Sequence, residues 1–136
     1  MKEINIKKDT KIHCLKSKTF PEGIAETHKK LHQKIPFHKG RNYYGISYMN
    51  SKGEIIYKAA IEEDRPGELQ HLNLDTFLIK SGKFASITIE NFVENIPKIK
   101  EAFNTLKNNP NIDPRGVALE WYSDGPDCRC MIRLND

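Results

Sequence analysis

Strand-like alternation and two helical stripes divide the chain into halves with the same order of elements. In the first half, residues 3–7 and 11–17 predict a β-hairpin across the turn at 8–10. A helical stripe follows, which Pro36 ends; its members are Ile24, His28, Leu31 and Ile35. Residues 42–50 and 54–62, joined by a Ser-Lys-Gly turn, predict a second hairpin.

The second half repeats this order about seventy residues later. Residues 76–80 and 83–90 flank the turn Ser81-Gly82 and predict a hairpin. A second helical stripe begins near Pro97 and ends at Asn109-Pro110; its members are Ile96, Ile99, Phe103 and Leu106. Residues 117–123 and 128–134 predict the final hairpin. Phe20 and Phe92 each precede a helix, and Tyr48 and Tyr122 each end a third strand.

Two such halves predict an α+β fold of two pseudo-symmetric βαββ modules with antiparallel sheets, each covered by its own helix. We assign residues 1–63 to module one, 64–74 to a polar connector and 75–136 to module two, within a single domain. A central cleft between the modules follows from this packing, and ligand pockets favour such junctions.

A carboxylate interrupts the apolar run 117–123. Strand alternation places Glu120 on one face with Ala118 and Tyr122. The opposite face carries Val117, Leu119 and Trp121. A carboxylate between an alanine and a tyrosine lies either at a solvated sheet edge or in a pocket that uses its charge. The pattern alone leaves both interpretations open.

The composition argues against a nucleic-acid-binding protein and against a secreted or membrane protein. The chain has 22 Lys+Arg and 18 Asp+Glu, a net charge of +4, and the basic residues are scattered. A dedicated nucleic-acid binder usually carries a stronger basic cluster. No signal-peptide pattern and no run of about 20 apolar residues occurs, so we expect a soluble cytoplasmic protein.

Cysteine and histidine spacing gives little support for a metal site. Cys14, Cys128 and Cys130 form no CxxC pair and are expected to be buried small hydrophobic residues. His28 and His32 have the i, i+4 spacing of a zinc pair, but a lysine stands where a metalloprotease needs glutamate. We expect His28 to pack and His32 to be solvated. We predict no metal and no cofactor.

The segments FLIKSGKFASITI, IPKIKEAFNTL and the E-x-Y of Glu120 and Tyr122 resemble the GyrI-like effector-binding domain. This family includes ligand-sensing portions of AraC-type and MerR-type transcription regulators. The similarity covers nearly the whole chain and is strongest over 75–134. It implies two βαββ modules whose cleft receives hydrophobic, often cationic molecules, as in multidrug recognition, with a carboxylate at Glu120.

The resemblance and the alternation together define candidate ligand-binding residues. Glu120 would pair with the charge. Tyr122 shares its face and could enter the same pocket, although a core tyrosine at the strand end is an equal alternative. Tyr44 and Tyr48 would approach the cleft from the other half, although plain packing is an equal alternative. Two further candidates lie nearby: Trp121 at a cleft rim or in the core, and Phe37, with His38, over the entrance.

Three functions remain open. Regulators of this family carry a helix-turn-helix before the effector domain, and the chain leaves no room for one, so we expect a stand-alone module without direct nucleic acid binding. The leading hypothesis is non-enzymatic binding of a hydrophobic, cationic small molecule. The second is a hydrolase of strained-ring alkylating compounds, with Glu120 orienting water or deprotonating it as a general base and Tyr122 or Trp121 holding the substrate. The third is a gyrase-inhibitor-like protein binder. A separate regulator chain could also be its partner.

Overall fold

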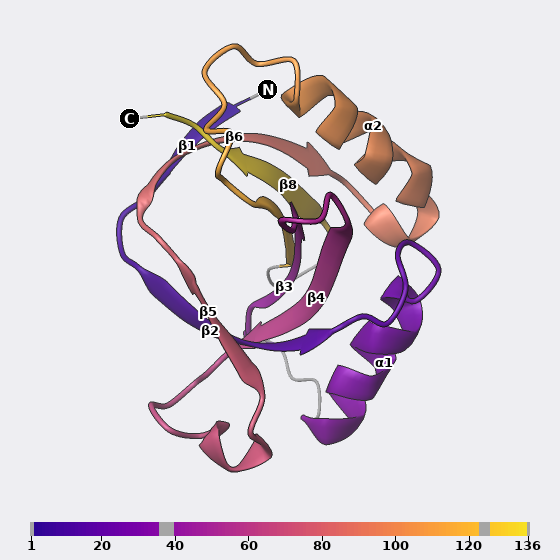
Figure 1. Cartoon of the computed structure of the whole chain (residues 1–136), viewed down its shortest axis with the longest axis vertical. Helices are drawn as coiled ribbons and strands as arrows, with labels where there is room; N and C mark the ends of the chain where they lie inside the picture. The colour runs from indigo at the N-terminus through magenta and orange to yellow at the C-terminus, as the bar shows by residue number, and fades with distance from the viewer. Residues whose placement is uncertain (1, 36–39, 123–125, 136) are drawn as a thin grey trace.

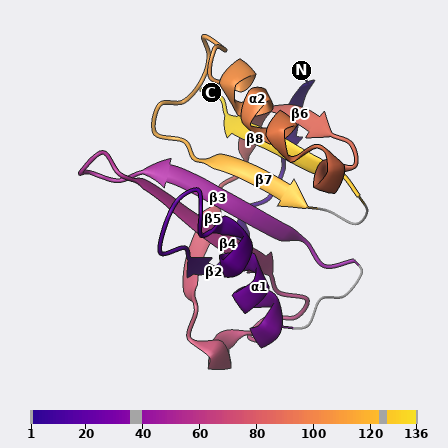
Figure 2. The same cartoon turned by 90° about the vertical axis from the view of Figure 1, so that its right-hand side faces the viewer.

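The computed structural model describes residues 2–35, 40–122 and 126–135. Within these residues, one antiparallel eight-stranded sheet curls into a half-barrel, and both α-helices lie on its outer side (Figures 1 and 2). The strands are β1 (Lys2–Ile6), β2 (Thr10–Lys16), β3 (Tyr43–Met49), β4 (Ile55–Glu62), β5 (Asp75–Ile79), β6 (Gly82–Ile89), β7 (Ala118–Tyr122) and β8 (Cys128–Arg133). The helices are α1 (Ile24–Lys34) and α2 (Ile96–Leu106), with 3₁₀ turns η1 (Gln70–Leu72) and η2 (Phe92–Glu94). The predicted α+β class with two βαββ modules is confirmed.

The strand order β1-β6-β8-β7-β3-β4-β2-β5 places β3 and β7 together at the centre. The predicted hairpins β3–β4 and β7–β8 are confirmed by their pairing. The two other predicted hairpins are wrong, because β1 pairs with β6 and β2 pairs with β5. Three or fewer residues join β1 to β2, and likewise β5 to β6, but the two joined strands do not pair with each other. The first strand of each half therefore pairs with a strand of the other half. Between these two connections, the Ser81 amide donates to the Asp9 carboxylate at 2.8 Å.

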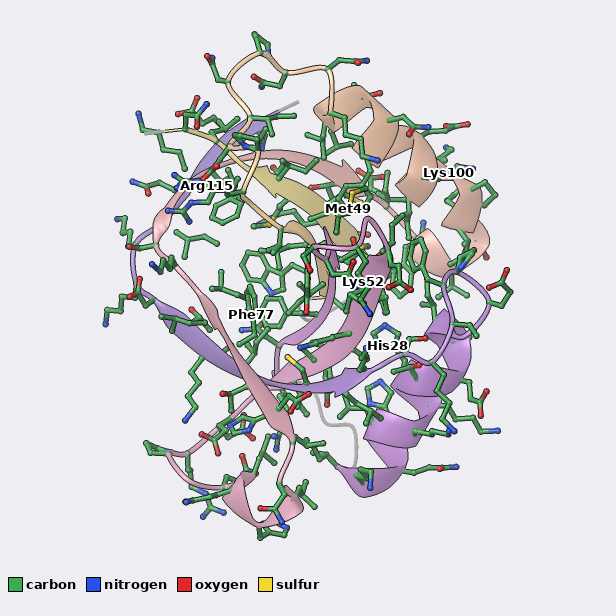
Figure 3. The ribbon with its side chains drawn as sticks, in the orientation of Figure 1. His28, Met49, Lys52, Phe77, Lys100 and Arg115 are labelled. Atoms are coloured by element: carbon green, nitrogen blue, oxygen red, sulfur yellow. The ribbon has the colours of Figure 1, made fainter. Side chains whose placement is uncertain are left out.

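The described residues form three clusters of buried apolar side chains. The first lies inside the curl, where Ile46, Phe84 and Leu119 are buried and Phe77 packs against them (Figure 3). The second lies under α2, which begins with a proline in its first turn, and includes Leu106, Cys128 and Cys130. The third lies under α1 and includes Leu31, Ala59 and Ile61. Each helix therefore covers the strands of its own half, as the helical stripes predict.

All three cysteines are buried and free, which confirms their predicted packing role. Burial raises the pKa of the Cys14 thiol to about 12, so it is an inert apolar side chain at neutral pH. Among the described residues, no helix combines the length and apolar character needed to span a membrane.

Candidate functional site

Glu120 is the centre of a hydrogen-bond network on the helix-facing side of the sheet. Its Oε1 atom accepts hydrogen bonds from the hydroxyls of Tyr57, at 2.8 Å, and Tyr122, at 2.7 Å. Among the residues that the structure describes, none donates to Oε2. The side chain is half-buried, and β7 is a central strand, so Glu120 does not lie at a solvated sheet edge.

A glycine makes the space for this network. Gly45 of β3 lies directly opposite Glu120 of β7. A Cβ atom at Gly45 would collide with Glu120 Oε1 and with the Tyr57 hydroxyl. The absent side chain therefore allows the tyrosine of β4 to reach across β3 to the carboxylate of β7.

His28 of α1 extends the network from the helix. Its Nε2 atom lies 2.7 Å from the Tyr57 hydroxyl. Since that hydroxyl donates to Glu120, the imidazole has to be the donor, which assigns the tautomer with a proton on Nε2. Burial, and secondarily the charge of His32, lowers the pKa of His28 to about 4, so the imidazole is neutral at pH 7. His28, Tyr57, Glu120 and Tyr122 thus form one hydrogen-bonded chain.

Burial and hydrogen bonding shift the pKa of the Glu120 carboxyl in opposite directions. Burial raises the pKa of Glu120, while the hydroxyls of Tyr122 and Tyr57 lower it in part. Burial, followed by the charge of Glu120, raises the pKa of both tyrosines, so they remain protonated donors. A positive charge brought close to Glu120 would favour its ionised form.

A cavity of about 840 Å³ lies beside this network, at the junction of the two halves. The first half contributes α1, including His28 and His32, together with Tyr43. The second half contributes Phe92, the exposed Val93 and Ile96, and Tyr122. Glu120 does not line the cavity itself, but lies behind Tyr122 and His28, which do.

Aromatic rings from both halves form part of the cavity wall. The rings of Phe92 and Tyr122 have centroids 5.0 Å apart, and His28 meets Tyr122 edge-on at 5.8 Å. His32 meets Tyr43 edge-on at 5.0 Å, so it is half-buried rather than solvated as predicted. These rings offer flat apolar surfaces and electron-rich faces, which suit an apolar or aromatic ligand with a positive charge.

The structure separates the predicted site residues into two groups. Tyr122 joins Glu120, as expected. Tyr44, Tyr48 and Trp121 lie on the inner face of the sheet, where Trp121 stacks on Tyr44 at 6.4 Å and donates to Asn42 at 3.0 Å. The register decides this, because Gly45 rather than Tyr44 pairs with Glu120, so Tyr44 and Tyr48 do not reach its face. Phe37 and His38 lie outside the described residues.

Sequence reasoning missed Tyr57 and Tyr43 and treated His28 as a packing residue. One signal was available in the repeat, since Phe20 and Phe92 occupy matching positions before the two helices. Phe20 stacks on Tyr57 at 6.0 Å, and Phe92 packs on Tyr122 at 5.0 Å. The matching phenylalanines therefore mark the two tyrosines that hold Glu120.

Comparison with known proteins identifies the fold. No protein-family model matches the chain, and no curated protein sequence matches it. The solved structure of SAV2435 bound to tetraphenylphosphonium is similar, with a TM-score of 0.64 and 10% identity, covering 98% of this chain and 93% of that one.

Two further solved structures are similar at about the same level. An integron cassette protein from the mobile metagenome of Vibrio cholerae has a TM-score of 0.68 and 14% identity, with 98% and 95% coverage. A candidate transcription regulation protein from Staphylococcus aureus MU50 has a TM-score of 0.68 and 11% identity, with 99% and 97% coverage. At these identities the likeness shows a shared fold over nearly the whole of each chain.

Proposed function

We propose that this protein is a GyrI-like effector-binding module that binds a hydrophobic, cationic small molecule in the junction cavity. The observation that carries the proposal is the state of Glu120. Two hydroxyls hold one of its oxygens, and the other accepts from none of the described residues, directly behind an aromatic wall. The complex of SAV2435, which shares the fold, with a lipophilic cation supports the same ligand class.

The interaction energies expected at this site favour a cation as the ligand. A half-buried carboxylate without a counter-charge has lost part of its hydration, and an incoming cation recovers part of that cost. At a separation of roughly 7 Å and an effective dielectric constant of about 20, the attraction is roughly 2 kcal/mol. Each ring facing the cation adds about 0.5 to 2 kcal/mol. The apolar walls therefore supply affinity for lipophilic molecules, and Glu120 selects the positively charged ones.

Two ions of the same shape test this selection. Tetraphenylphosphonium and tetraphenylborate differ chiefly in the sign of their charge, and isothermal titration calorimetry at about pH 8 measures their affinities. We expect the protein to prefer the cation. Glu120→Gln should weaken phosphonium binding about tenfold, because it removes the charge and keeps the shape.

The matched control is Glu101→Gln, which removes an exposed carboxylate from α2. It should leave both affinities within about twofold, since exposed charges are screened. Equal phosphonium affinity in the wild type and in Glu120→Gln would contradict the proposal, as would no binding of either ion. Hydrolysis and gyrase binding remain predictions, because no contact among the described residues favours either over ligand binding.

A further inference from the structure

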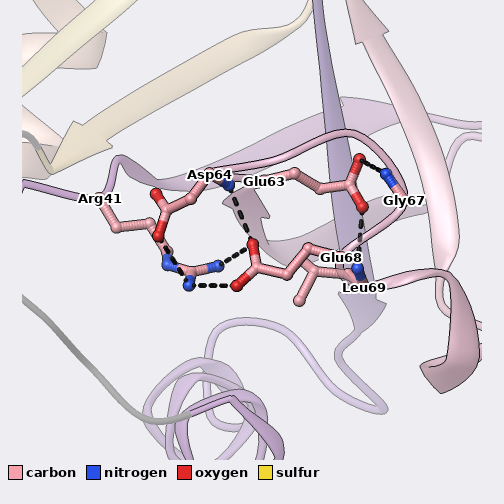
Figure 4. Close-up of polar contacts among 6 residues, drawn as sticks. All are labelled: Arg41, Glu63, Asp64, Gly67, Glu68 and Leu69. Carbon is pink, nitrogen blue, oxygen red and sulfur yellow. Dashed lines mark hydrogen bonds and ion pairs between the residues drawn. The ribbon is translucent and has the colours of Figure 1, made fainter.

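Among the described residues that line the cavity is a cation of the protein itself, Arg41. Its side chain is only 5% exposed and lies where α1 and β3 border the cavity. The guanidinium makes a two-pronged contact with Glu68, at 2.9 and 3.3 Å, and lies 3.0 Å from an Asp64 oxygen (Figure 4). Both carboxylates belong to the connector between the two halves.

The connector holds these carboxylates in fixed positions. The Asp64 amide donates to Glu68 at 3.0 Å, and Glu63 accepts from the Leu69 amide at 2.8 Å. Leu69 is buried in the cluster under α1, which anchors the segment. The hydrogen bond from Arg41 is the main cause that lowers the pKa of Glu68, so this carboxylate is ionised at neutral pH.

The charges around Arg41 affect how the wall treats a charged ligand, and the described lining also includes the carboxylate of Glu22. Two carboxylates contact this guanidinium, so its positive charge is neutralised within the cluster. Without its partners, Arg41 would place an uncompensated positive charge at the wall and oppose a cation. A positive charge with so little exposure is weakly screened by solvent, so its neutralisation matters for the ligand.

We infer that Asp64 and Glu68 are specificity-determining residues, which make the junction cavity selective for cations by neutralising Arg41. The inference rests on the proposed function and adds a second determinant, far along the chain from Glu120. The connector would then be part of the binding site rather than only a covalent link between the halves.

A purely structural role for the ion pairs makes a different prediction. If the ion pairs only hold the connector in place, removing one carboxylate should weaken the binding of every ligand. If they set the charge of the wall, the same change should weaken cation binding and strengthen anion binding. Opposite shifts for two ions of equal shape therefore separate the two roles.

The experiment measures both tetraphenylphosphonium and tetraphenylborate affinities at low ionic strength, about 20 mM, where electrostatic effects are largest. In Glu68→Gln we expect roughly fivefold weaker phosphonium binding and roughly fivefold tighter borate binding. Arg41→Met should have the reverse effect, with tighter phosphonium binding and weaker borate binding. The matched control is Glu101→Gln, which removes an exposed carboxylate of α2 that is not part of the cavity lining and does not contact Arg41 in the described contacts. Its ratio of affinities should stay within about twofold of the wild type.

An unchanged ratio in Glu68→Gln, or parallel losses for both ions, would overturn the inference while leaving the proposed function intact. Wild-type protein that binds neither ion would overturn both. Circular dichroism checks the fold of each variant. If Glu68→Gln does not fold, Asp64→Asn and Arg41→Met decide the question by the same two measurements.

Discussion

At the scale of single residues, His28 shows how burial converts a titratable group into a fixed hydrogen-bond donor. Its ring packs between Tyr57 and Tyr122, each with a centroid 5.8 Å away, and its Nε2 proton is directed to the Tyr57 hydroxyl. A charged imidazole would lose more hydration than these contacts return, which lowers its pKa. The neutral ring therefore holds Tyr57 in place without adding positive charge beside the cavity.

Stability should consequently depend on pH through His28. Its pKa is about 4 in the folded protein and about 6.5 when unfolded, so between these values the unfolded chain binds more protons. The stability is fully present above pH 6.5 and is lost as the pH falls toward 4. Between pH 7 and pH 5 we expect His28 to account for a decrease of about 2 kcal/mol in the free energy of unfolding, measured with urea.

Two variants check the assignment to His28. His28→Asn should reduce the pH dependence over this range, whatever its effect on stability at pH 7, and burial of His32, which also lowers that group's pKa, accounts for a remaining slope. His71→Gln, which changes an exposed histidine on η1, should retain the wild-type slope. A wild-type slope in His28→Asn would show that other groups cause the dependence.

At the scale of elements, the close approach at the centre of the sheet depends on Gly45. β3 separates β4 from β7, so the Tyr57 side chain has to cross β3 to reach Glu120. It crosses where β3 has no side chain. The glycine therefore has a steric role, because its backbone needs no positive φ.

Gly45→Ala should break this crossing. The added Cβ overlaps both the Tyr57 hydroxyl and Glu120 Oε1, and we expect a loss of about 2 to 3 kcal/mol in the free energy of unfolding together with weaker phosphonium binding. The control is Ser47→Ala, two residues along the same strand face, with an expected loss below about 1 kcal/mol. Equal stability of Gly45→Ala and the wild type in urea would show that the network tolerates displacement.

At the scale of the whole molecule, strand exchange makes the two halves one structure. β1 adds to the sheet of the second half, β5 adds to that of the first, and β3–β7 joins them at the centre. Neither half therefore completes its own sheet. The ligand cavity also takes its wall from both halves, so binding and folding depend on the same junction.

The halves should therefore unfold together. Amide hydrogen exchange, followed by NMR, should give the most protected amides of β4 and β8 the same opening free energy within about 1 kcal/mol. These strands lie in different halves and do not pair with each other. A consistently less stable β4 would contradict the single-domain prediction, and saturating phosphonium should raise the protection of both strands equally.

The helices, the strands and the alternating faces of the strand residues could be predicted from the sequence, because strand alternation and helical period are local steric properties. Strand alternation predicts that Glu120 and Tyr122 share one face. The two helical stripes predict that each half is covered by its own helix. Three features depend instead on contacts between distant parts of the chain: the exchange of β1 and β5, the register that turns Tyr44 and Tyr48 away, and the convergence of His28 and Tyr57 on Glu120. Both strand pairings satisfy the same alternation, and the choice between them depends on long-range packing that no local pattern contains.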